Sequence, residues 1–395
     1  MKIILNWINT LIDPKSVKIT IFLTFLILFV LEAISSIAYF QKNRSIVQSI
    51  SSTVASIQWL IPRLKLEKKE EKYTTIKKLR NEGAYVYPSY LFEPVFHDPD
   101  SIYHLANVPN SLIILCDSNE IYTQFISDEL GFRNPLGQIG NRIFDYMFIG
   151  DSFVEGACVD NEYTFAGVFR EKEKTVFNMG KGGSGPLFNL ATLVEYGTNI
   201  QTKNVIWFVF TGNDLQDLRE EKTSFLGRYI NNEFSQDLWG KKEEVSNELK
   251  LFLDNEIDLF EQRNNQNSFL QPEIDYGPRI DLVDAIHKDL PLLKKIAKKI
   301  KNITHGFDAN LKIVIINHPR YRNYEIQKLT SEKIKEFSIE NNVSFIEFSN
   351  EYLSDHYEEY YNAKEPHFNS FGYKKIAEVI HEWATSENQK NNVIL

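Results

Sequence analysis

The sequence is poor in cysteine. Its 395 residues include two cysteines, Cys116 and Cys158. A structural zinc site uses closely spaced Cys or His ligands, and the spacing of these two residues matches no such signature. The sequence therefore predicts no structural metal. It leaves open whether the two cysteines form one disulfide or remain two buried thiols.

Basic charge is also scarce. The chain has 44 Lys and Arg residues against 53 Asp and Glu residues, which gives a formal net charge of −9. A nucleic-acid-binding domain normally shows a basic patch or stripe. The most lysine-rich stretch, 294–301, is interpreted as the solvated face of a helix. The sequence therefore predicts no nucleic-acid partner.

One long apolar run occurs, near the N-terminus. Residues 19–31 are apolar residues and threonine, and the run continues to Phe40 with few polar interruptions. Its length of about 22 residues is what a bilayer-spanning helix needs. Glu32 lies toward one end of the run, where a charge costs less than at the centre of the membrane. We predict a transmembrane anchor over residues 19–40.

The charges beside this run indicate its orientation. Three lysines precede it, whereas Lys42 and Arg44 follow it. This slight excess favours an inside N-terminus, so we expect residues 1–18 in the cytoplasm and the rest of the chain outside it. A cleaved signal peptide is the first alternative, because Ser36 and Ala38 are small residues spaced for cleavage. A buried core helix is the second.

Residues 41–144 fall into two segments that differ in composition. Residues 41 to about 80 are polar and lysine-rich with amphipathic helical spacing, which predicts a stalk or a helix packed on the body. From about residue 84, short apolar or aromatic runs are broken by Pro, Asn, Asp and Gly, as in strands and hairpins. We therefore treat 41–144 as a stalk followed by a strand and hairpin region.

Beyond residue 144, apolar strands alternate with helical stretches. The strand-like runs are YMFIG (146–150), TVFNMG (175–180), NVIWFVF (204–210), KIVIIN (312–317) and SFIEF (344–348). Continuous apolar strands separated by helices are typical of a parallel sheet covered on both faces. We predict an α/β core in two parts, 145–214 and 306–385. The charged, helical insertion 215–305 is expected to cap the carboxyl ends of the strands, and 386–395 to form a tail.

In open parallel sheets, ligands bind at the carboxyl ends of the strands. The first strand leads directly into Gly150, Asp151 and Ser152. A serine in this place can be a helix N-cap. It can also be an exposed nucleophile, with the backbone N–H groups of the following helix placed to hold a developing oxyanion.

The second strand leads into the glycine-rich run NMGKGGSGP (178–186). Gly180, Gly182 and Gly185 match a dinucleotide-binding G-x-G-x-x-G pattern. That pattern belongs on the first strand of its unit, and here no suitable acid follows about 20 residues later. Pro186 also removes an amide from the helix start. We instead expect Gly183 to present its backbone N–H to the reacting centre, with a glycine turn without chemistry as the alternative.

Two more polar groups follow later strands. Asn213, after the third strand, is expected to direct its amide into the cleft, although an Asx turn would explain it as well. His367 lies in EPHFNSFG (365–372), just before the last amphipathic helix, where a general base could lean over the edge of the sheet. His318, after the fourth strand, is the alternative candidate for the general base.

Four motifs in this order resemble the SGNH (GDSL-like) hydrolase superfamily. Gly150-Asp151-Ser152 resembles its first block, Gly183 its second-block glycine, Gly212-Asn213-Asp214 its third block, and EPHFNSFG around His367 its final block. The resemblance covers about 145–215 and 310–385, a little over a third of the chain. It implies a three-layer α/β/α, flavodoxin-like sandwich.

One position departs from the family pattern. Family members usually carry Asp two or three residues before the histidine, whereas this chain has Lys364 and Glu365 there. Glu365 is expected to orient His367, with a Ser–His dyad held by a backbone carbonyl as the alternative.

The resemblance implies acyl transfer through a serine. His367 would take the proton of Ser152, which would attack an ester carbonyl and form an acyl-enzyme. The Ser152 and Gly183 N–H groups and the Asn213 amide would hold the oxyanion. Supporting roles fall to Gly150, Asp151, Gly212 and Asp214. No metal or organic cofactor is expected.

The substrate is predicted from location and resemblance together. A membrane-tethered, extracytoplasmic SGNH domain is expected to cleave O-acyl esters, O-acetyl above all, of cell-envelope carbohydrate. One alternative is an O-acyltransferase that modifies an extracellular polysaccharide. The other is a non-catalytic envelope-assembly protein on the same fold. The oligomeric state does not follow from the sequence.

Overall fold

The computed structural model describes residues 69–89, 102–118, 121–139, 143–231, 233–264, 287–320, 324–362, 366–386 and 392–395. All of them belong to one structural unit, 62–395. The expected cytoplasmic segment 1–18, the anchor 19–40 and Glu365 lie outside the described residues. Within the described ranges, the helices are too short or too polar to cross a membrane.

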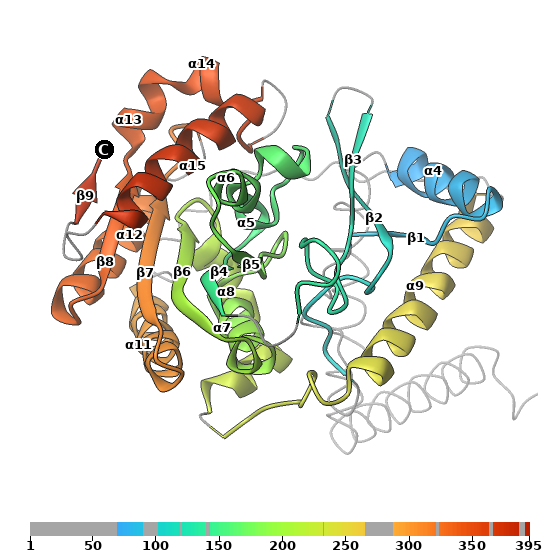
Figure 1. The fold of residues 1–395 in the computed structure, drawn as a ribbon, viewed down its shortest axis with the longest axis horizontal. Coiled ribbons are helices and arrows are strands. Elements are labelled where there is room, and N and C mark those ends of the chain that lie inside the picture. Colours follow the sequence, from blue (N-terminus) through green and yellow to red (C-terminus); the bar gives the residue numbers. More distant parts are fainter. Residues whose placement is uncertain are drawn as a thin grey trace, which may run out of the picture. The chain divides into compact units, whose positions relative to one another are not determined.

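A parallel sheet of six strands forms the centre of the described fold (Figure 1). Its strands are β4 (Phe144–Ile149), β5 (Val176–Asn178), β6 (Thr202–Phe210), β7 (Asn310–Ile316), β8 (Ser344–Phe348) and β9 (Val393–Ile394). Their order is β5-β4-β6-β7-β8-β9, and every pairing is parallel. This confirms the α/β class, and the five predicted strands all form, with bounds that differ from the predicted ones by at most two residues.

The sixth strand differs from the prediction. Residues 386–395 were expected to form a tail, but Val393 and Ile394 pair with Ile346 and Glu347 of β8. A strand of two residues has no periodicity that a sequence pattern could show. Its register comes from β8, whose outer edge it covers.

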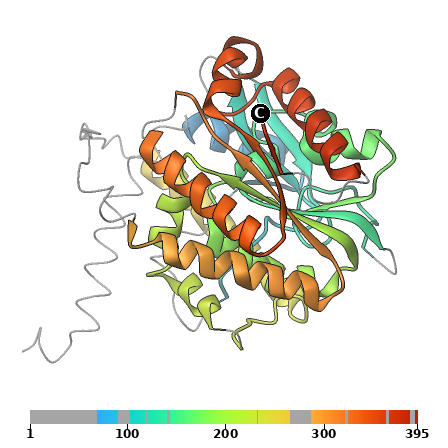
Figure 2. The ribbon, with the colours of Figure 1, turned by 90° about the vertical axis from the view of Figure 1, so that its left-hand side faces the viewer.

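Helices cover both faces of this sheet (Figure 2). Successive side chains of a strand point to opposite faces. Accordingly, Val205, Trp207 and Val209 of β6 pack in one core, and Ile206, Phe208 and Phe210 pack in the other. The first core includes residues of α7 (Pro186–Glu195), α11 (Leu290–Gly306) and α12 (Tyr324–Glu340). The second includes residues of α6 (Phe165–Glu171) and α15 (Ser370–Thr385).

Short helices connect these elements at the ends of the strands. They are α5 (Ser152–Glu155), η2 (Asn161–Tyr163), η3 (Gly197–Asn199), α8 (Asp214–Glu221), η4 (Phe225–Ile230), α13 (Asn350–Asp355) and α14 (Tyr357–Tyr360). Between α5 and η2 lies Cys158, which is disulfide-bonded, and the sequence holds one other cysteine. Cys158 is therefore not a free thiol, which rules out the alternative of two buried thiols.

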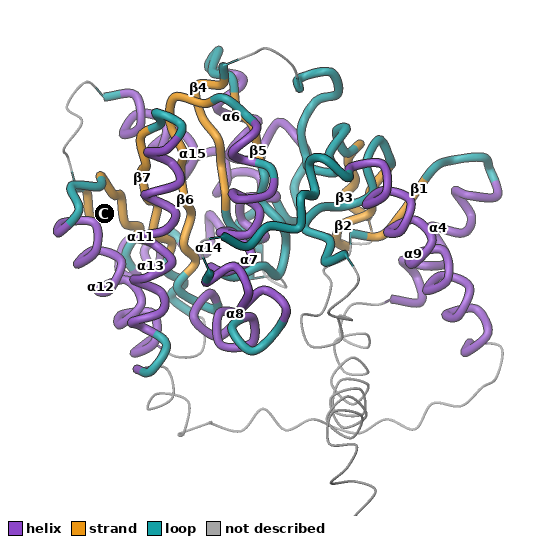
Figure 3. The backbone as a smooth tube through the Cα atoms, turned by 90° about the horizontal axis from the view of Figure 1, so that it is seen from below, coloured by secondary structure: helices purple, strands orange, loops and turns teal. Residues whose placement is uncertain are grey.

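The segment before β4 forms a second, smaller sheet (Figure 3). Strand β1 (Val86–Pro88) pairs in parallel with β2 (Leu112–Ser118), which pairs antiparallel with β3 (Ile121–Ile126). Two helices pack on it, α4 (Lys69–Asn81) and α9 (Lys242–Asn264). Leu249 and Leu253 of α9 lie in one apolar cluster with residues of all three strands. We call residues 69–139 the N-terminal region.

The insertion 215–305 is divided between the two sheets. Helix α9 covers the small sheet, whereas α11 packs on the parallel sheet through Leu293, Ile296 and Ile300. This arrangement differs from the single cap that was expected at the strand ends. The reason is the apolar stripe of α11, which makes that helix part of a regular layer of the sandwich. Residues 265–286 lie outside the described part.

Candidate active site

The turn after β4 places Ser152 at the first residue of α5. The N-cap of this helix is Asp151, whose carboxylate accepts a hydrogen bond from the Phe153 N–H at 3.0 Å. A Cβ at Gly150 would lie 2.5 Å from a methyl group of Val154, so only glycine fits between strand and helix. Because Asp151 provides the cap, capping does not account for Ser152.

The structure brings Ser152 and His367 together. His367 Nε2 lies 2.8 Å from Ser152 Oγ, although the two residues are 215 positions apart. His367 stands just before α15, whose N-cap Asn369 accepts a hydrogen bond from the Gly372 N–H at 2.8 Å. The histidine ring also packs on Phe153, with 5.1 Å between ring centroids. A nucleophile within hydrogen-bond reach of a base is the arrangement that serine catalysis needs.

The electrostatics of the site favour a neutral His367. Burial of the imidazole, helped by the neighbouring His318, lowers the pKa of His367 to about 4, whereas the Glu155 carboxylate acts to raise it. A histidine with such a pKa is unprotonated at neutral pH and can accept a proton. Both Ser152 and His367 are partly exposed, so a substrate can reach them.

The three expected oxyanion donors also reach the surface. Gly183 is exposed and has φ of 78°, and Ser152 and Asn213 are partly exposed. Among the described residues, the N–H groups of Ser152 and Gly183 have no acceptor. Asn213 Nδ2 donates to Asp217 Oδ2 at 2.8 Å, which leaves its second hydrogen for a ligand. Asp217, which orients this amide, was not predicted.

The glycine-rich turn after β5 packs against the nucleophile helix. A Cβ at Gly180 would lie 2.4 Å from the Glu155 nitrogen, and one at Gly182 would lie 3.7 Å from Ser152 Cβ. These glycines therefore permit close approach to α5, which brings the turn beside Ser152. Gly183 thus lies in a turn that packs beside Ser152, and its role as an oxyanion donor stays a prediction.

The end of the same turn excludes the dinucleotide interpretation. A dinucleotide would place its pyrophosphate at the N-terminus of the following helix, here α7. Glu221 of α8 already occupies that position. Its carboxylate accepts hydrogen bonds from the N–H groups of Gly185 at 2.7 Å and Leu187 at 2.9 Å. Burial raises the pKa of Glu221 to about 7, and these hydrogen bonds oppose the shift.

The supporting acids are buried beneath the exposed donors. Asp214 accepts a hydrogen bond from the Phe210 N–H at 3.0 Å, which closes the end of β6, and Gly212 lies in the turn between them. Burial, with a smaller contribution from Asp151, raises the pKa of Asp214 well above its usual range. Burial likewise raises the pKa of Asp151 to about 7. Both acids shape the strand ends and do not face solvent.

His318 belongs to the wall of the site. It is 3% exposed, and its ring lies 4.6 Å from that of Tyr361. Burial lowers the pKa of His318 to about 4, which a hydrogen bond with the Pro366 backbone partly opposes. Because Pro366 precedes His367, His318 supports the loop that carries the base. The histidine within hydrogen-bond distance of the Ser152 hydroxyl is His367 and not His318.

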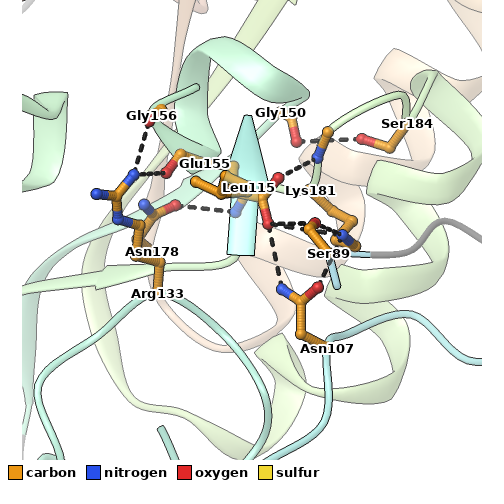
Figure 4. Close-up of polar contacts among 12 residues, drawn as sticks. Ser89, Asn107, Leu115, Arg133, Gly150, Glu155, Gly156, Asn178, Lys181 and Ser184 are labelled. Atoms are coloured by element: carbon orange, nitrogen blue, oxygen red, sulfur yellow. Dashed lines mark hydrogen bonds and ion pairs between the residues drawn. The ribbon is translucent and has the colours of Figure 1, made fainter. Parts of the chain in front are cut away.

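Four further residues connect the site to the N-terminal region (Figure 4). Glu155 accepts hydrogen bonds from the Gly182 N–H at 2.7 Å and from the Asn107 amide at 3.1 Å. Lys181 Nζ lies 3.5 Å from the Glu155 carboxylate and donates to Ser89 and Asn107. The prediction missed these contacts. The one sequence feature that pointed to these contacts was Lys181 inside the glycine-rich turn. A lysine in a sequence does not indicate which distant residue it pairs with.

Arg133 and Asn134 were also missed. Just beyond the end of α5, Arg133 donates to the Gly156 carbonyl at 2.6 Å (Figure 4). It also donates to the Val159 carbonyl at 2.8 Å. The Asn134 amide accepts from the Asn178 N–H at 2.8 Å and donates to the Asn178 carbonyl at 2.9 Å. The N-terminal region therefore holds both the nucleophile helix and the end of β5.

No protein-family model and no curated protein matches this sequence. The chemistry of the site must therefore be inferred from its own geometry.

Proposed function

We propose that this chain is an SGNH-type serine esterase that cleaves O-acyl esters through an acyl-enzyme. The observation that carries the proposal is the 2.8 Å contact between Ser152 Oγ and His367 Nε2 at the carboxyl end of a parallel sheet. Numbered within the core, the strand order β5-β4-β6-β7-β8 is 2-1-3-4-5, the flavodoxin-like order. That order supports the three-layer sandwich which the SGNH resemblance implies.

The first half-reaction acylates Ser152. His367 Nε2 takes the hydroxyl proton while Ser152 Oγ attacks the ester carbonyl, and the carbonyl oxygen becomes an oxyanion. When this intermediate collapses, the ester bond breaks and His367 returns the proton to the leaving alcohol. The lowered pKa of His367 keeps the ring available as a base at neutral pH.

The oxyanion would be held by N–H groups that have no other acceptor among the described residues. The N–H groups of Ser152 and Gly183 meet this condition among the described residues, and Asn213 has one amide hydrogen to offer. Removal of one such donor typically lowers kcat by about 100- to 1000-fold. In the second half-reaction a water molecule, activated by His367, attacks the acyl-enzyme and releases the acid.

Glu365 is proposed to orient His367 by accepting a hydrogen bond at Nδ1. It stands two residues before the histidine, close to the place of the family's aspartate, but lies outside the described residues. A Ser–His dyad remains the alternative. The two differ in the effect of Glu365→Gln, which would slow acylation strongly in a triad and little in a dyad.

The proposed substrate is an O-acetyl ester of cell-envelope carbohydrate. This choice rests on the proposed anchor over 19–40 and on the partial exposure of Ser152 and His367. Hydrolysis and transfer differ only in whether water or a sugar hydroxyl intercepts the acyl-enzyme. Transfer to sugar, in place of release of acetate, would therefore make the chain an acyltransferase with the same site.

The test is active-site labelling of the full-length protein. A fluorophosphonate probe and p-nitrophenyl acetate are applied to the unmodified chain, Ser152→Ala and His367→Ala. We expect labelling and hydrolysis that vanish in Ser152→Ala and fall by about 1000-fold or more in His367→Ala. Ser338→Ala is the matched control, because this buried hydroxyl of α12 bonds only its own helix, at Ile334 O. A folded, unlabelled wild type would favour the non-catalytic assembly protein.

A further inference from the structure

Two opposite charges are buried beside the nucleophile helix. The side chains of Glu155 and Lys181 are 3% and 2% exposed, and 3.5 Å separates their charged atoms. Burying such a pair costs desolvation energy, and well-packed apolar residues of similar volume often give equal or greater stability. Stability alone therefore gives little reason for these two residues. Their place in the fold suggests another role.

The side chain of Glu155 and the backbone of Lys181 hold the glycine turn. Glu155 ends α5, three residues after Ser152, and its Oε2 accepts the Gly182 N–H at 2.7 Å. The backbone of Lys181 is fixed as well, since its N–H donates to the Gly150 carbonyl at 3.1 Å. The turn is thereby tied to both ends of the segment that carries Ser152.

The bond to Glu155 also decides which N–H the turn presents. Gly182 gives its N–H to the carboxylate, so it has none to offer a substrate. The following residue, Gly183, is exposed with φ of 78°, a left-handed conformation that favours glycine. Its N–H has no acceptor among the described residues. Fixing the peptide before Gly182 therefore restrains the orientation of the next one, which carries the proposed oxyanion donor.

The N-terminal region completes this cluster (Figure 4). Asn107 donates to Glu155 at 3.1 Å and accepts from Lys181 at 2.9 Å, so one amide bridges both charges. Ser89 accepts from Lys181 at 2.7 Å. Both residues lie outside the parallel-sheet core, after β1 and before β2. The core alone would leave these charges with fewer partners.

We propose that Glu155 and Lys181 are a positioning pair, which sets the Gly182–Gly183 turn beside Ser152, and that Ser89 and Asn107 of the N-terminal region complete it. The inference rests on the proposed esterase function. It makes the N-terminal region part of the catalytic architecture, because the oxyanion donor depends on contacts from that region.

Variants of Glu155 and Lys181 distinguish a role in positioning the glycine turn from mere neutralisation of a buried charge. Glu155→Gln and Lys181→Met each leave one buried charge without its partner. The double variant E155Q/K181M leaves no charge and keeps an oxygen for the Gly182 N–H. The double variant E155M/K181M leaves no charge and no acceptor. All four full-length proteins are compared by kcat and KM with p-nitrophenyl acetate and by the rate of fluorophosphonate labelling, and near-UV circular dichroism checks their folding.

We expect each single variant to lose about 100-fold in kcat with little change in KM, because a donor displaced by about 1 Å costs that much. E155Q/K181M should recover about tenfold relative to either single variant, whereas E155M/K181M should remain as slow as they are. The matched control is Glu195→Gln. Glu195 is also buried and accepts several hydrogen bonds, including one from the Tyr229 hydroxyl at 2.6 Å, but it lies at the far end of α7. It should lose stability and keep its turnover.

Ser89→Ala provides a milder variant that keeps both charges, in case the others do not fold. It removes the hydrogen bond from Lys181 and a longer one, of 3.5 Å, that the Ser89 hydroxyl donates to Glu155. We expect it to lower kcat by about tenfold. The proposal is overturned if folded variants keep wild-type kcat and lose only stability, as Glu195→Gln does, or if E155M/K181M recovers as well as E155Q/K181M. A wild type that neither labels nor hydrolyses would instead remove the esterase function, and this inference with it.

Discussion

Asp151 and Ser152 show how neighbouring polar residues divide structural and chemical tasks. Asp151 is buried and caps α5 through the Phe153 N–H. Ser152 is therefore not needed as a cap, and its hydroxyl lies 2.8 Å from His367. The same division holds after β6, where buried Asp214 closes the strand and the neighbouring Asn213 is partly exposed. In both pairs the buried carboxylate fixes the backbone that presents its neighbour.

The pKa of His367 predicts the pH dependence of acylation. Burial and His318 lower this pKa to about 4, and the Glu155 carboxylate only partly opposes them. The ring accepts a proton only when neutral, so activity should be lost as the pH falls through about 4 and stay constant up to neutrality. A pH profile of kcat/KM with p-nitrophenyl acetate measures this. A midpoint near 6.5 would instead indicate that the proposed Glu365 carboxylate offsets the burial by stabilising the protonated ring.

At the element scale, α7 depends on a cap that comes from another helix. Its N-cap residue is Gly185, which has no side chain to accept the N–H groups of the first turn. Glu221 of α8 accepts hydrogen bonds from two of them, those of Leu187 and Phe188, and also from the N–H of Gly185. A Cβ at Gly185 would come within 2.8 Å of Glu221 Oε2, so glycine is needed for this close approach. The two helices are thus joined beneath the glycine turn.

Replacing Glu221 should destabilise the fold. Glu221→Ala leaves the three buried N–H groups of Gly185, Leu187 and Phe188 without this acceptor. We expect the free energy of unfolding to fall by about 2–4 kcal/mol. Urea denaturation measures this change. Gln216→Ala, at an exposed position of the same helix, should change it by less than about 0.5 kcal/mol. Equal stability of the two variants would mean that water replaces the carboxylate at this helix end.

At the scale of the whole described fold, the N-terminal region is joined to the parallel-sheet core by buried polar contacts. Arg133 lies 5% exposed and reaches three carbonyl groups around the end of α5. Burial lowers the pKa of Arg133 to about 10, so it remains charged at neutral pH. A cation among carbonyl groups at a helix C-terminus is favourable. Such contacts should make the two parts unfold together.

We therefore expect one cooperative urea transition for the described unit, with the same midpoint by tryptophan fluorescence and by far-UV circular dichroism. Arg133→Met leaves buried carbonyls without donors and should lower the free energy of unfolding by about 3 kcal/mol. Arg320→Met is the control, because the side chain of Arg320 is 60% exposed and its ion pair with Glu358 should contribute less than about 1 kcal/mol. Two separate transitions in the wild type would show that the N-terminal region folds independently.

The sequence by itself determined the parallel sheet and the residues at its strand ends. Strands buried on both faces are continuous apolar runs, and such runs can be read locally, as 204–210 and 344–348 show. Because parallel strands end at one edge, the polar residues that follow them must converge. That topological rule predicts that the residues after the first three strands, among them Ser152, lie at one edge. The expectation that His367, which precedes the last helix, joins Ser152 across 215 positions came from the order of the four motifs.

Only the tertiary structure decided how these residues are supported. The partners of Glu155, Arg133 and Glu221 come from distant segments, and no local pattern names the partner of a charged residue. The pairing of β9 with β8 and the division of 215–305 between two sheets likewise depend on which apolar surfaces remain uncovered once the core forms. Periodicity along a chain records which face of an element is buried, whereas the surface that buries it is set by packing in three dimensions.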